Sequence, residues 1–256
     1  MTRRSSPKIV LQSDEVHLWT ACLEQPPQRL GLLEQTLCAE ERERADRFRF
    51  ERDRSHFIAG RGLLRMLLAG YLGSEPQQIE FRYADNGKPE LVQDSAGVDL
   101  RFNCTHSQQL ALYAIADGRR IGVDVEALRD LPDADEIARF CFSARENARL
   151  RSLSPEQKRQ AFFNGWTRKE AYLKAVGEGL RRPLDRVEVT LAPAESAALL
   201  SVDGDRQAAS RWSLEAPSVG PCYAAALVVE GVHRLTRCGS LSWLALASTG
   251  GDLRRR

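Results

Sequence analysis

The sequence has no apolar run long enough to span a membrane and no apolar segment of signal-peptide type near its start. A membrane-spanning helix needs about 20 mostly apolar residues, and a signal peptide needs an apolar core behind its basic residues. The opening stretch, MTRRSSPKIVLQSDEVHLW, has the basic residues without such a core. We therefore expect a cytoplasmic protein with no membrane partner.

The chain also lacks a large excess of charge of one sign. Its 37 Lys and Arg stand against 35 Asp and Glu, which gives a formal net charge of +2. Nucleic-acid-binding proteins normally carry a strongly basic surface, so no nucleic-acid partner is expected.

Paired cysteine motifs are missing too. None of the six cysteines lies in a C-x-x-C pair, and they are scattered along the chain. This spacing excludes the common zinc-finger and thioredoxin-like motifs. Without a secretion signal, we expect the cysteines to be reduced.

The remaining pattern predicts a mixed α+β protein, because strand-like and helix-like segments alternate without a regular repeat. At 256 residues and 43% hydrophobic content, the chain can bury a substantial core in one or two domains. The segment 110–116 leads through DGRR into a second strand, which predicts a hairpin over 110–126. Strands are expected over 7–21, 78–83, 110–116, 121–126, 186–191 and 223–230, and helices over 39–72, 133–151 and 156–177.

Two acids interrupt the apolar strand RRIGVDVEAL, residues 119–128. Side chains alternate along a strand, so Asp124 and Glu126 share one face while the isoleucine and valines share the other. Their spacing of about 6–7 Å would let both carboxylates approach one cation. From this stretch alone, an exposed polar face on an edge strand is an equally good interpretation.

The helical segment FFNGWTRKEAYLKAVGEGL, residues 162–180, supplies a third acid. Glu170 flanks the apolar stripe of this helix, and Lys174 lies one turn further along on the same side. An ordinary surface pair at i,i+4 spacing would give the same pattern. The predicted buried stripe consists of Phe162, Trp166, Leu173 and Val176.

A histidine stands in the polar stretch RFNCTHSQQ, residues 101–109, just before a predicted strand. Cys104 and His106 are too far apart for direct proton transfer, at about 6–7 Å on an extended chain. Together, GKP, FNCTHS, GVDVE and WTRKEAYLKAVGEGL resemble the motifs of the Sfp-type 4′-phosphopantetheinyl transferases, in the same order and over roughly residues 40–190. Thr105 stands where that family usually has serine, and it keeps the hydroxyl.

This resemblance implies an enzyme of the holo-[acyl-carrier-protein] synthase type. Such an enzyme transfers the 4′-phosphopantetheine arm of coenzyme A to a serine of an apo acyl, peptidyl or aryl carrier protein, and it releases adenosine 3′,5′-bisphosphate. The family requires Mg²⁺, for which the resemblance implies the ligands Asp124, Glu126 and Glu170. Glu170 is also the implied general base, while Lys174 and His106 match positions that contact the phosphates of coenzyme A.

Further coenzyme A contacts follow from the same resemblance. Arg44 matches a position that grips the ribose 3′-phosphate. Arg82 and Lys88 belong to the stretch around GKP that lines the nucleotide end, and Thr105 completes the coenzyme A-binding set. Most of the other charges near Arg44 are expected to form a solvated helix face, because acids and bases alternate there.

The fold implied by the resemblance is a pseudo-dimer of two similar halves, each a small antiparallel-rich sheet packed with helices. The active site would lie where the halves meet. The halves are expected at 1–118 and 119–245, followed by a flexible tail over 246–256. We expect a monomer, because a fused pair of halves already contains the contact between subunits.

The carrier protein is the expected macromolecular partner, and the stretch FCFSARENARLRS, residues 140–152, is a candidate docking segment. Arg145 and Arg149 would share one helix face, with Phe140 and Phe142 as an apolar anchor. The alternative is a solvated helix with buried phenylalanines, in which Glu146 partly offsets the positive charge.

Two other functions use the same residues. One is a magnesium-dependent hydrolase of nucleotide or coenzyme A pyrophosphates, which would direct the carboxylates, Lys174 and His106 at a water. The other is a catalytically silent module that binds coenzyme A or a carrier. Incubation of coenzyme A with and without a carrier protein separates these alternatives.

Overall fold

The computed structural model describes residues 9–84, 87–92, 99–179 and 182–241. The predicted tail over 246–256 lies outside the described residues. The helices are α1 (Pro27–Glu34), α2 (Ala39–Asp46), α3 (Glu51–Leu72), α4 (Ala134–Cys141), α5 (Ala144–Arg151), α6 (Pro155–Val176) and α7 (Arg206–Ala209). The strands are β1 (Glu15–Cys22), β2 (Phe81–Tyr83), β3 (Pro89–Leu91), β4 (Leu100–Ser107), β5 (Leu110–Asp117), β6 (Ile121–Ala127), β7 (Val187–Val189), β8 (Leu199–Val202), β9 (Trp212–Glu215), β10 (Tyr223–Glu230) and β11 (Arg234–Ser240).

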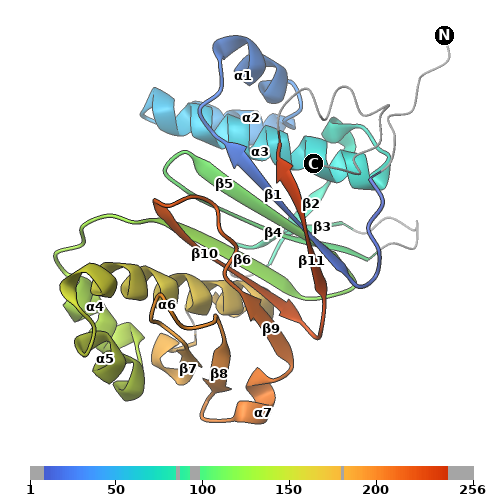
Figure 1. Cartoon of the computed structure of the whole chain (residues 1–256). Coiled ribbons are helices and arrows are strands. Elements are labelled where there is room, and N and C mark those ends of the chain that lie inside the picture. Colours follow the sequence, from blue (N-terminus) through green and yellow to red (C-terminus); the bar gives the residue numbers. More distant parts are fainter. Residues whose placement is uncertain (1–8, 85–86, 93–98, 180–181, 242–256) are drawn as a thin grey trace, which may run out of the picture.

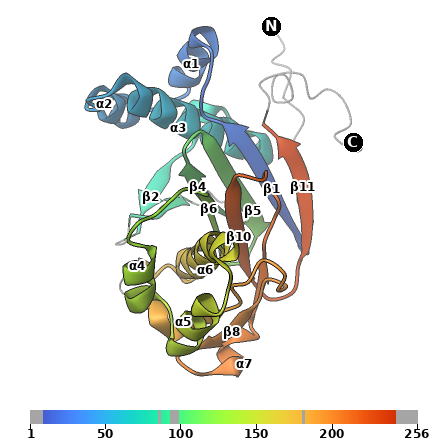
Figure 2. The same ribbon diagram turned by 60° about the vertical axis from the view of Figure 1, so that its left-hand side comes forward.

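Two sheets form the centre of the molecule, with the long helices α3 and α6 on their outer sides (Figures 1 and 2). The first sheet has the strand order β11-β1-β5-β4 and the second has the order β6-β10-β9. A cluster of aliphatic side chains from β1, β5, β6 and β10 packs between the sheets. This arrangement confirms the predicted α+β class built from two similar halves.

The acidic strand has the alternation that its sequence predicts. Ile121, Val123 and Val125 are buried in the aliphatic cluster between the sheets. The opposite face of β6 lies against α6, which makes many contacts with both β6 and β10. The alternation therefore places Asp124 on the side of the strand that α6 covers.

The predicted hairpin over 110–126 is wrong. β5 pairs with β1 on one edge and β4 on the other, so no edge of β5 is left for β6. β6 pairs instead with β10 in the second sheet. Gly118, with φ +63°, allows the turn that carries the chain from one sheet to the other.

The predicted helix over 39–72 is two helices, α2 and α3, and residues 47–50 separate them. Phe50 is extended, with φ −107° and ψ 133°, directly before α3. Few side chains of the charged helix α2 are buried, so α2 has no apolar stripe that would continue into α3. The orientation of α2 is set instead by individual contacts with α3. One such contact joins the buried Glu41 to Arg65 Nε at 2.6 Å. As predicted, Gly73 ends α3 in the left-handed conformation.

The predicted helix over 133–151 is likewise divided into α4 and α5. Phe142 lies between them in an extended conformation and is buried against the ring of Phe162. Ser143 then caps α5 by accepting a hydrogen bond from the amide of Glu146. The predicted helix over 156–177 corresponds closely to α6, which ends at Gly177.

The last described strand returns to the first sheet. β11 runs parallel to β1, from the pair Glu15 and Arg234 to the pair Thr20 and Ser240. Residues expected in the second half thus complete the sheet of the first half, and the division at residue 118 stays a prediction.

The described cysteines 22, 38, 104, 141 and 222 are free. In the part of the chain that the structure describes, no helix is both long and apolar enough to cross a membrane.

Candidate active site

The two halves meet where β4, an edge strand of the first sheet, lies along β6 of the second. Every second side chain of β4 from residue 103 to residue 107 is polar and forms a hydrogen bond with β6. Asn103 Oδ1 accepts a 2.8 Å hydrogen bond from the amide of Val123. Two residues further on, Thr105 Oγ1 donates to Asp124 Oδ1 at 3.1 Å. Ser107 Oγ donates to Glu126 Oε2 at 3.0 Å, so both acids of the predicted pair are held from the other half.

A close approach of α6 to β6 brings the lysine of the helix to the acidic strand. A Cβ atom at Gly122 would lie 2.0 Å from the carbonyl oxygen of Ala171 and 2.4 Å from the amide of Ala175. Only glycine fits this contact, because both clashing atoms belong to the helix backbone. Across it, Lys174 Nζ donates to Asp124 Oδ1 at 2.6 Å and to Thr105 Oγ1 at 3.2 Å. Lys174 is therefore part of the polar join between the halves.

The carboxylates at this join influence each other's protonation. Burial raises the pKa of Asp124, and the neighbouring Lys174 opposes this shift. Burial also raises the pKa of Glu170, and the negative charges of Asp124 and Glu126 raise it further. The second carboxylate oxygen of Asp124 is buried and has no hydrogen-bond partner among the described residues. Such an oxygen is available to a cation that enters the site.

The fit of these acids to Mg²⁺ follows from the ligands that this ion prefers. Within the described ranges, no three His, Cys, Asp or Glu side chains form a cluster that could hold a metal ion by themselves. Mg²⁺ usually binds one or two carboxylates and completes its octahedron with water and substrate phosphate oxygens. The unpartnered oxygen of Asp124 suits that mode, with Glu126 and Glu170 as the other candidate ligands.

A cleft of about 690 Å³ opens beside β4, and it contains three of the predicted coenzyme A contacts. Arg44 of α2 and both Thr105 and His106 of β4 line it. The guanidinium of Arg44 also lies 5.2 Å from the centre of the Phe57 ring. Burial within the cleft lowers the pKa of His106, and the nearby His56 and Lys174 lower it further.

Other residues of the cleft were not predicted from the sequence. Arg52, His56 and Arg61 lie on α3 and line the same cleft. Arg52 and His56 are four residues apart and share one side of the helix, which was the available signal. Arg61, nine residues after Arg52, is not marked by this spacing. The balanced charge of the segment concealed this signal, because acids between the arginines made the whole stretch resemble a solvated helix face. Asn103 and Ser107 were also missed as partners of β6.

Arg82 and Lys88 do not line this cleft. Arg82 is exposed on β2 and pairs with Glu90 at 3.0 Å. Lys88 Nζ instead donates to the backbone carbonyl of Lys174 at 2.6 Å and to that of Ile121 at 3.1 Å. Burial lowers the pKa of Lys88 to about 8. Nucleotide binding by Arg82 and Lys88 stays a prediction.

The candidate docking segment has one exposed and one buried phenylalanine. Phe142 is 2% exposed and belongs to the core, whereas Phe140 is 75% exposed. Glu146 is buried and pairs with Lys169 at 2.7 Å, so it does not offset the surface charge of α5 as expected. Arg145 and Arg149 are both exposed on α5, and Arg149 pairs with Glu195 at 2.8 Å.

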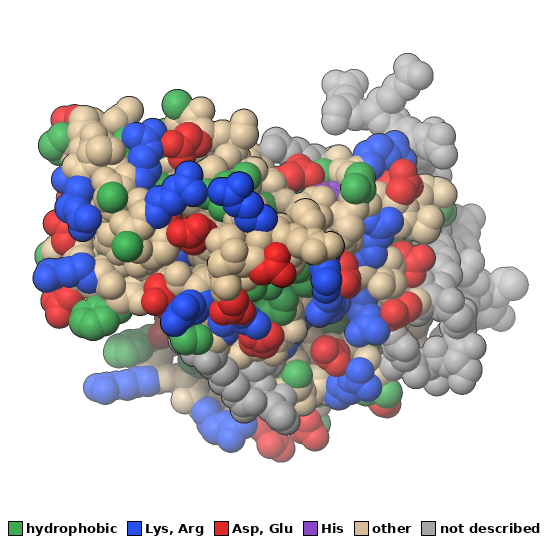
Figure 3. Space-filling model, turned by 90° about the horizontal axis from the view of Figure 1, so that it is seen from below, with side chains coloured by type: hydrophobic (Ala, Val, Ile, Leu, Met, Phe, Trp, Pro, Cys, Tyr) green, Lys and Arg blue, Asp and Glu red, His purple; other side chains and the backbone are tan. Residues whose placement is uncertain are grey.

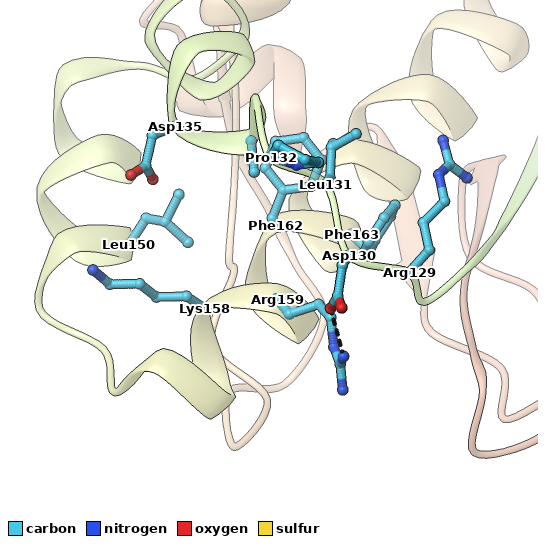
Figure 4. Close-up of a pocket in the computed structure, with 11 residues that line it drawn as sticks. Arg129, Asp130, Leu131, Pro132, Asp135, Leu150, Lys158, Arg159, Phe162 and Phe163 are labelled. Atoms are coloured by element: carbon cyan, nitrogen blue, oxygen red, sulfur yellow. Dashed lines mark hydrogen bonds and ion pairs between the residues drawn. The ribbon is translucent and has the colours of Figure 1, made fainter.

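A second hollow, of about 300 Å³, lies between α5, the first half of α6 and the segment that follows β6 (Figure 4). Leu150 and Phe162 line its apolar side, and Arg159 pairs with Asp130 at its edge at 3.0 Å. Seen from below, basic and acidic described side chains are interspersed on this face of the molecule (Figure 3). This face therefore presents mixed charge rather than a patch of one sign.

Comparisons with known proteins match nearly the whole described chain. Residues 19–117 match the family model "4'-phosphopantetheinyl transferase, N-terminal". Residues 120–228 match the model of the 4'-phosphopantetheinyl transferase superfamily. The gap between the two matches falls at Gly118 and Arg119, where the chain passes from one sheet to the other.

Individual relatives carry the same description. The chain is 48% identical over 208 residues to 4'-phosphopantetheinyl transferase HetI of Nostoc sp., which covers 81% of this chain and 84% of that protein. It is 34% identical over 153 residues to a 4'-phosphopantetheinyl transferase of Bacillus subtilis, covering 60% of this chain and 66% of that protein. A solved structure described as a "Chronobacterium ammoniagenes ACPS-CoA complex" is 20% identical, with a TM-score of 0.34, and covers 46% of this chain and 99% of that one. With both of its halves matched by family models and a relative at this identity, the chain belongs to the 4'-phosphopantetheinyl transferase superfamily.

Proposed function

We propose that this phosphopantetheinyl transferase uses coenzyme A as donor and modifies a serine of an apo carrier protein in a Mg²⁺-dependent reaction of the holo-[acyl-carrier-protein] synthase type. The observation that carries the proposal is the polar join of Thr105, Asp124 and Lys174, next to a cleft lined by basic side chains. Coenzyme A is a polyanion at its nucleotide end, and the transferred group leaves from its pyrophosphate. A basic cleft that opens beside carboxylates suits both parts of such a molecule.

In the proposed complex, the cleft binds the nucleotide. Arg44 of α2, Arg61 of α3 and His106 of β4 all line this cleft. The positive charges of Arg44 and Arg61 would offset the ribose phosphate and the pyrophosphate, because arginine can bind phosphate oxygens in pairs, and His106 would donate a hydrogen bond to a phosphate oxygen. Adenosine 3′,5′-bisphosphate, the leaving group, would stay bound to these residues as its charge increases.

Glu170 is the proposed general base for the carrier serine. In the metal-free protein, burial and the charges of Asp124 and Glu126 raise the pKa of Glu170, so its carboxylate is a stronger base than that of an exposed glutamate. Lys174, one turn further along α6, is placed to stabilise negative charge on the phosphoryl oxygens. Bound Mg²⁺ would polarise the pyrophosphate, and Asp124 would hold the ion with Glu126 and Glu170 as the other candidate ligands.

The proposed carrier-docking surface consists of Arg145 and Arg149 on α5 together with Phe140 at the end of α4. An exposed phenylalanine beside exposed arginines suits an acidic carrier with an apolar contact residue. Since Arg149 already pairs with Glu195, we assign the larger share of the steering to Arg145.

The test is mass spectrometry of several apo carrier proteins after incubation with the protein, coenzyme A and Mg²⁺. We expect a mass increase equal to one phosphopantetheine group and the release of adenosine 3′,5′-bisphosphate. Both products should disappear with Glu170→Gln and on removal of Mg²⁺ by a chelator. Cleavage of coenzyme A in the absence of any carrier would support a hydrolase instead. Binding of coenzyme A with neither product would indicate a silent binding module.

A further inference from the structure

The C-terminal turn of α6 depends on a residue from the other half of the molecule. The helix ends at Val176, and Gly177 follows in the left-handed conformation with φ +79°. The amide of Gly177 donates to the carbonyl of Leu173 and closes the last turn. Beyond this point the chain leaves the helix, so the next carbonyl, that of Lys174, needs a partner from outside the helix.

Lys88 provides this partner. Its ammonium group lies 2.6 Å from the carbonyl oxygen of Lys174 and 3.1 Å from that of Ile121, the first residue of β6. A positive charge at the C-terminal end of a helix is favourable, because the exposed carbonyls carry partial negative charge. One side chain therefore joins the end of α6 to the beginning of β6.

The backbone around Lys88 is itself fixed. The carbonyl of Lys88 accepts a hydrogen bond from the amide of Ala84 across the turn between β2 and β3, and Pro89 follows directly. Proline restricts the conformation of the residue before it, which limits the directions that Lys88 can take. The hydrogen bond from Ala84 and the following Pro89 thus hold the backbone from which Lys88 extends its ammonium group.

This contact lies next to the residues proposed to act on the substrate. The carbonyl that Lys88 binds belongs to Lys174, whose side chain donates to Asp124. Ile121 precedes Gly122, where the backbones of α6 and β6 approach closely. We propose that Lys88 is a positioning residue of the transferase: it fixes the end of α6 against β6, and so holds Lys174 beside Asp124.

This inference rests on the proposed function, but it makes a claim about the free protein as well. A lysine that holds the end of α6 should affect the chemical step. A lysine that only binds the nucleotide should affect the affinity for coenzyme A. If Lys88 positions the helix, its replacement should lower kcat and should change the end of α6 even without substrate. If Lys88 only binds the nucleotide, its replacement should raise the KM for coenzyme A and leave the free helix end unchanged.

The experiment compares the wild type with Lys88→Met and Lys88→Arg. Amide hydrogen exchange over 171–178 is followed in the free protein, and kcat and the KM for coenzyme A are measured with an apo carrier. For Lys88→Met we expect exchange over 171–178 to become at least about tenfold faster. We also expect kcat to fall at least about tenfold, with KM for coenzyme A within about twofold of wild type. Lys88→Arg, which can still donate to both carbonyls, should recover most of both properties.

Lys158→Met is the matched control, since it removes a lysine from the opposite end of α6. It should leave exchange over 171–178 and kcat unchanged. Unchanged exchange in Lys88→Met would overturn the positioning role, and so would a raised KM for coenzyme A with an unchanged kcat. Absence of transfer in the wild type would count against the proposed function. The exchange measurement alone would then show whether Lys88 holds the end of α6 in the free protein.

Discussion

Lys174 Nζ lies 2.6 Å from Asp124 Oδ1, although the two residues are 50 positions apart in the chain. The carboxylate side chain of Asp124 is 6% exposed and that of Lys174 is 29% exposed. The ion pair uses one oxygen of Asp124, and the other oxygen has no partner among the described residues. Asp124 is thus held in place by the lysine while one of its oxygens stays available.

Replacement of Asp124 by asparagine should remove activity without unfolding the protein. Asp124→Asn keeps the shape of the side chain and one oxygen that can accept from Thr105 and Lys174, but it replaces the unpartnered oxygen by an NH2 group and removes the negative charge that a cation needs. We expect kcat/KM to fall at least about 100-fold, as is typical when a main electrostatic contributor to catalysis is lost. The melting temperature should change little, because burial already disfavours the charged form of this residue. Activity is measured by carrier mass shift and stability by thermal unfolding.

Asp130→Asn provides the comparison, because the Asp130 side chain is 93% exposed. It should behave like the wild type in both measurements. Full activity in Asp124→Asn would remove Asp124 from the proposed catalytic site.

Gly122→Ala should separate α6 from β6. The added methyl group would meet backbone atoms of Ala171 and Ala175, which cannot rotate away. We expect a loss of about 1–3 kcal/mol in the free energy of unfolding, or more, measured by urea denaturation. Transfer activity of the folded fraction should fall as well, because the contact between Lys174 and Asp124 also joins α6 to β6 and would be stretched.

The matched control for this substitution is Gly31→Ala in α1. No atom lies within 4 Å of the Cβ position at Gly31, so the methyl group is accommodated. Alanine inside a helix is favoured over glycine by about 0.5–1 kcal/mol, and the variant should be as stable as wild type or more so. Equal stability of Gly122→Ala and wild type would contradict the close approach of β6 and α6.

The buried pair of Lys169 and Glu146 should be essential for stability. Their side chains are 1% and 3% exposed, and Glu146 also accepts a hydrogen bond from the amide of Val189 at 2.8 Å. Lys169→Met leaves a buried carboxylate without its partner, which typically costs about 3–5 kcal/mol. The double variant Lys169→Met with Glu146→Gln should recover part of this loss.

The measurement is urea unfolding of both variants, compared with a surface pair. Arg159→Met breaks the exposed pair with Asp130, and it should cost no more than about 1 kcal/mol. A small effect of Lys169→Met would mean that water reaches the first turn of α5 and solvates Glu146.

The buried His17 should make the protein less stable at acidic pH. Its Nδ1 lies 2.6 Å from Tyr71 Oη, which also accepts a 2.9 Å hydrogen bond from Trp19. Burial lowers the pKa of His17, although the neighbouring Glu15 opposes this shift. The folded state therefore binds the proton less well than the unfolded state. The contribution of His17 to the free energy of unfolding is fully present above the usual histidine pKa of about 6.5, and it is lost as the pH falls below that value.

His17→Asn tests this prediction, because its side-chain oxygen can still accept from Tyr71 but does not titrate in this range. We expect the free energy of unfolding to depend less steeply on pH between about 5 and 7, by up to about 1.4 kcal/mol per pH unit. The other described histidines, such as His56, also have lowered pKa values and preserve a residual slope of the same sign. An identical slope in wild type and variant would show that His17 does not titrate in this range.

The sequence predicted local features of the site well, because strand and helix periodicity report which side chains share a face. The alternation in β6 and the helical pattern of α6 correctly placed apolar side chains in the core. Periodicity carries no information on which distant elements pack together. The helical spacing offered only Glu170, one turn away on the same helix, as a protein partner of Lys174, whereas the structure pairs Lys174 with Asp124.

Errors in the predicted fold have the same origin. β5 and β6 follow each other in sequence with only a short turn between them, which normally indicates a hairpin. The partners of β5 come instead from β1 and β4, and the turn at Gly118 leads out of the first sheet. The docking hypothesis placed Phe142 at the surface as an apolar anchor, and the solvated-helix alternative, which buries the phenylalanines, left Glu146 exposed to offset the arginines. The burial of these two residues depends on contacts with Phe162 and Lys169 of α6, which no local pattern reports.

Charge reversal on α5 should weaken the interaction with the carrier protein. Arg145→Glu replaces an exposed positive charge, and we expect the KM for an acidic carrier to rise at low salt. Arg149→Glu should have a smaller effect, since Arg149 already pairs with Glu195. The KM for coenzyme A should stay constant in both variants, because neither residue lines the basic cleft.

Salt dependence distinguishes steering by charge from a local disturbance of α5. At 1 M salt the range of electrostatic interactions falls to about 3 Å, so the difference between Arg145→Glu and wild type should largely disappear. Arg206→Glu, an exposed reversal on α7, is the control and should not change the carrier KM at any salt concentration. Phe140→Ala should raise the carrier KM equally at low and high salt, because the loss of an apolar contact is not screened. If Arg145→Glu has the wild-type carrier KM at low salt, α5 does not take part in docking.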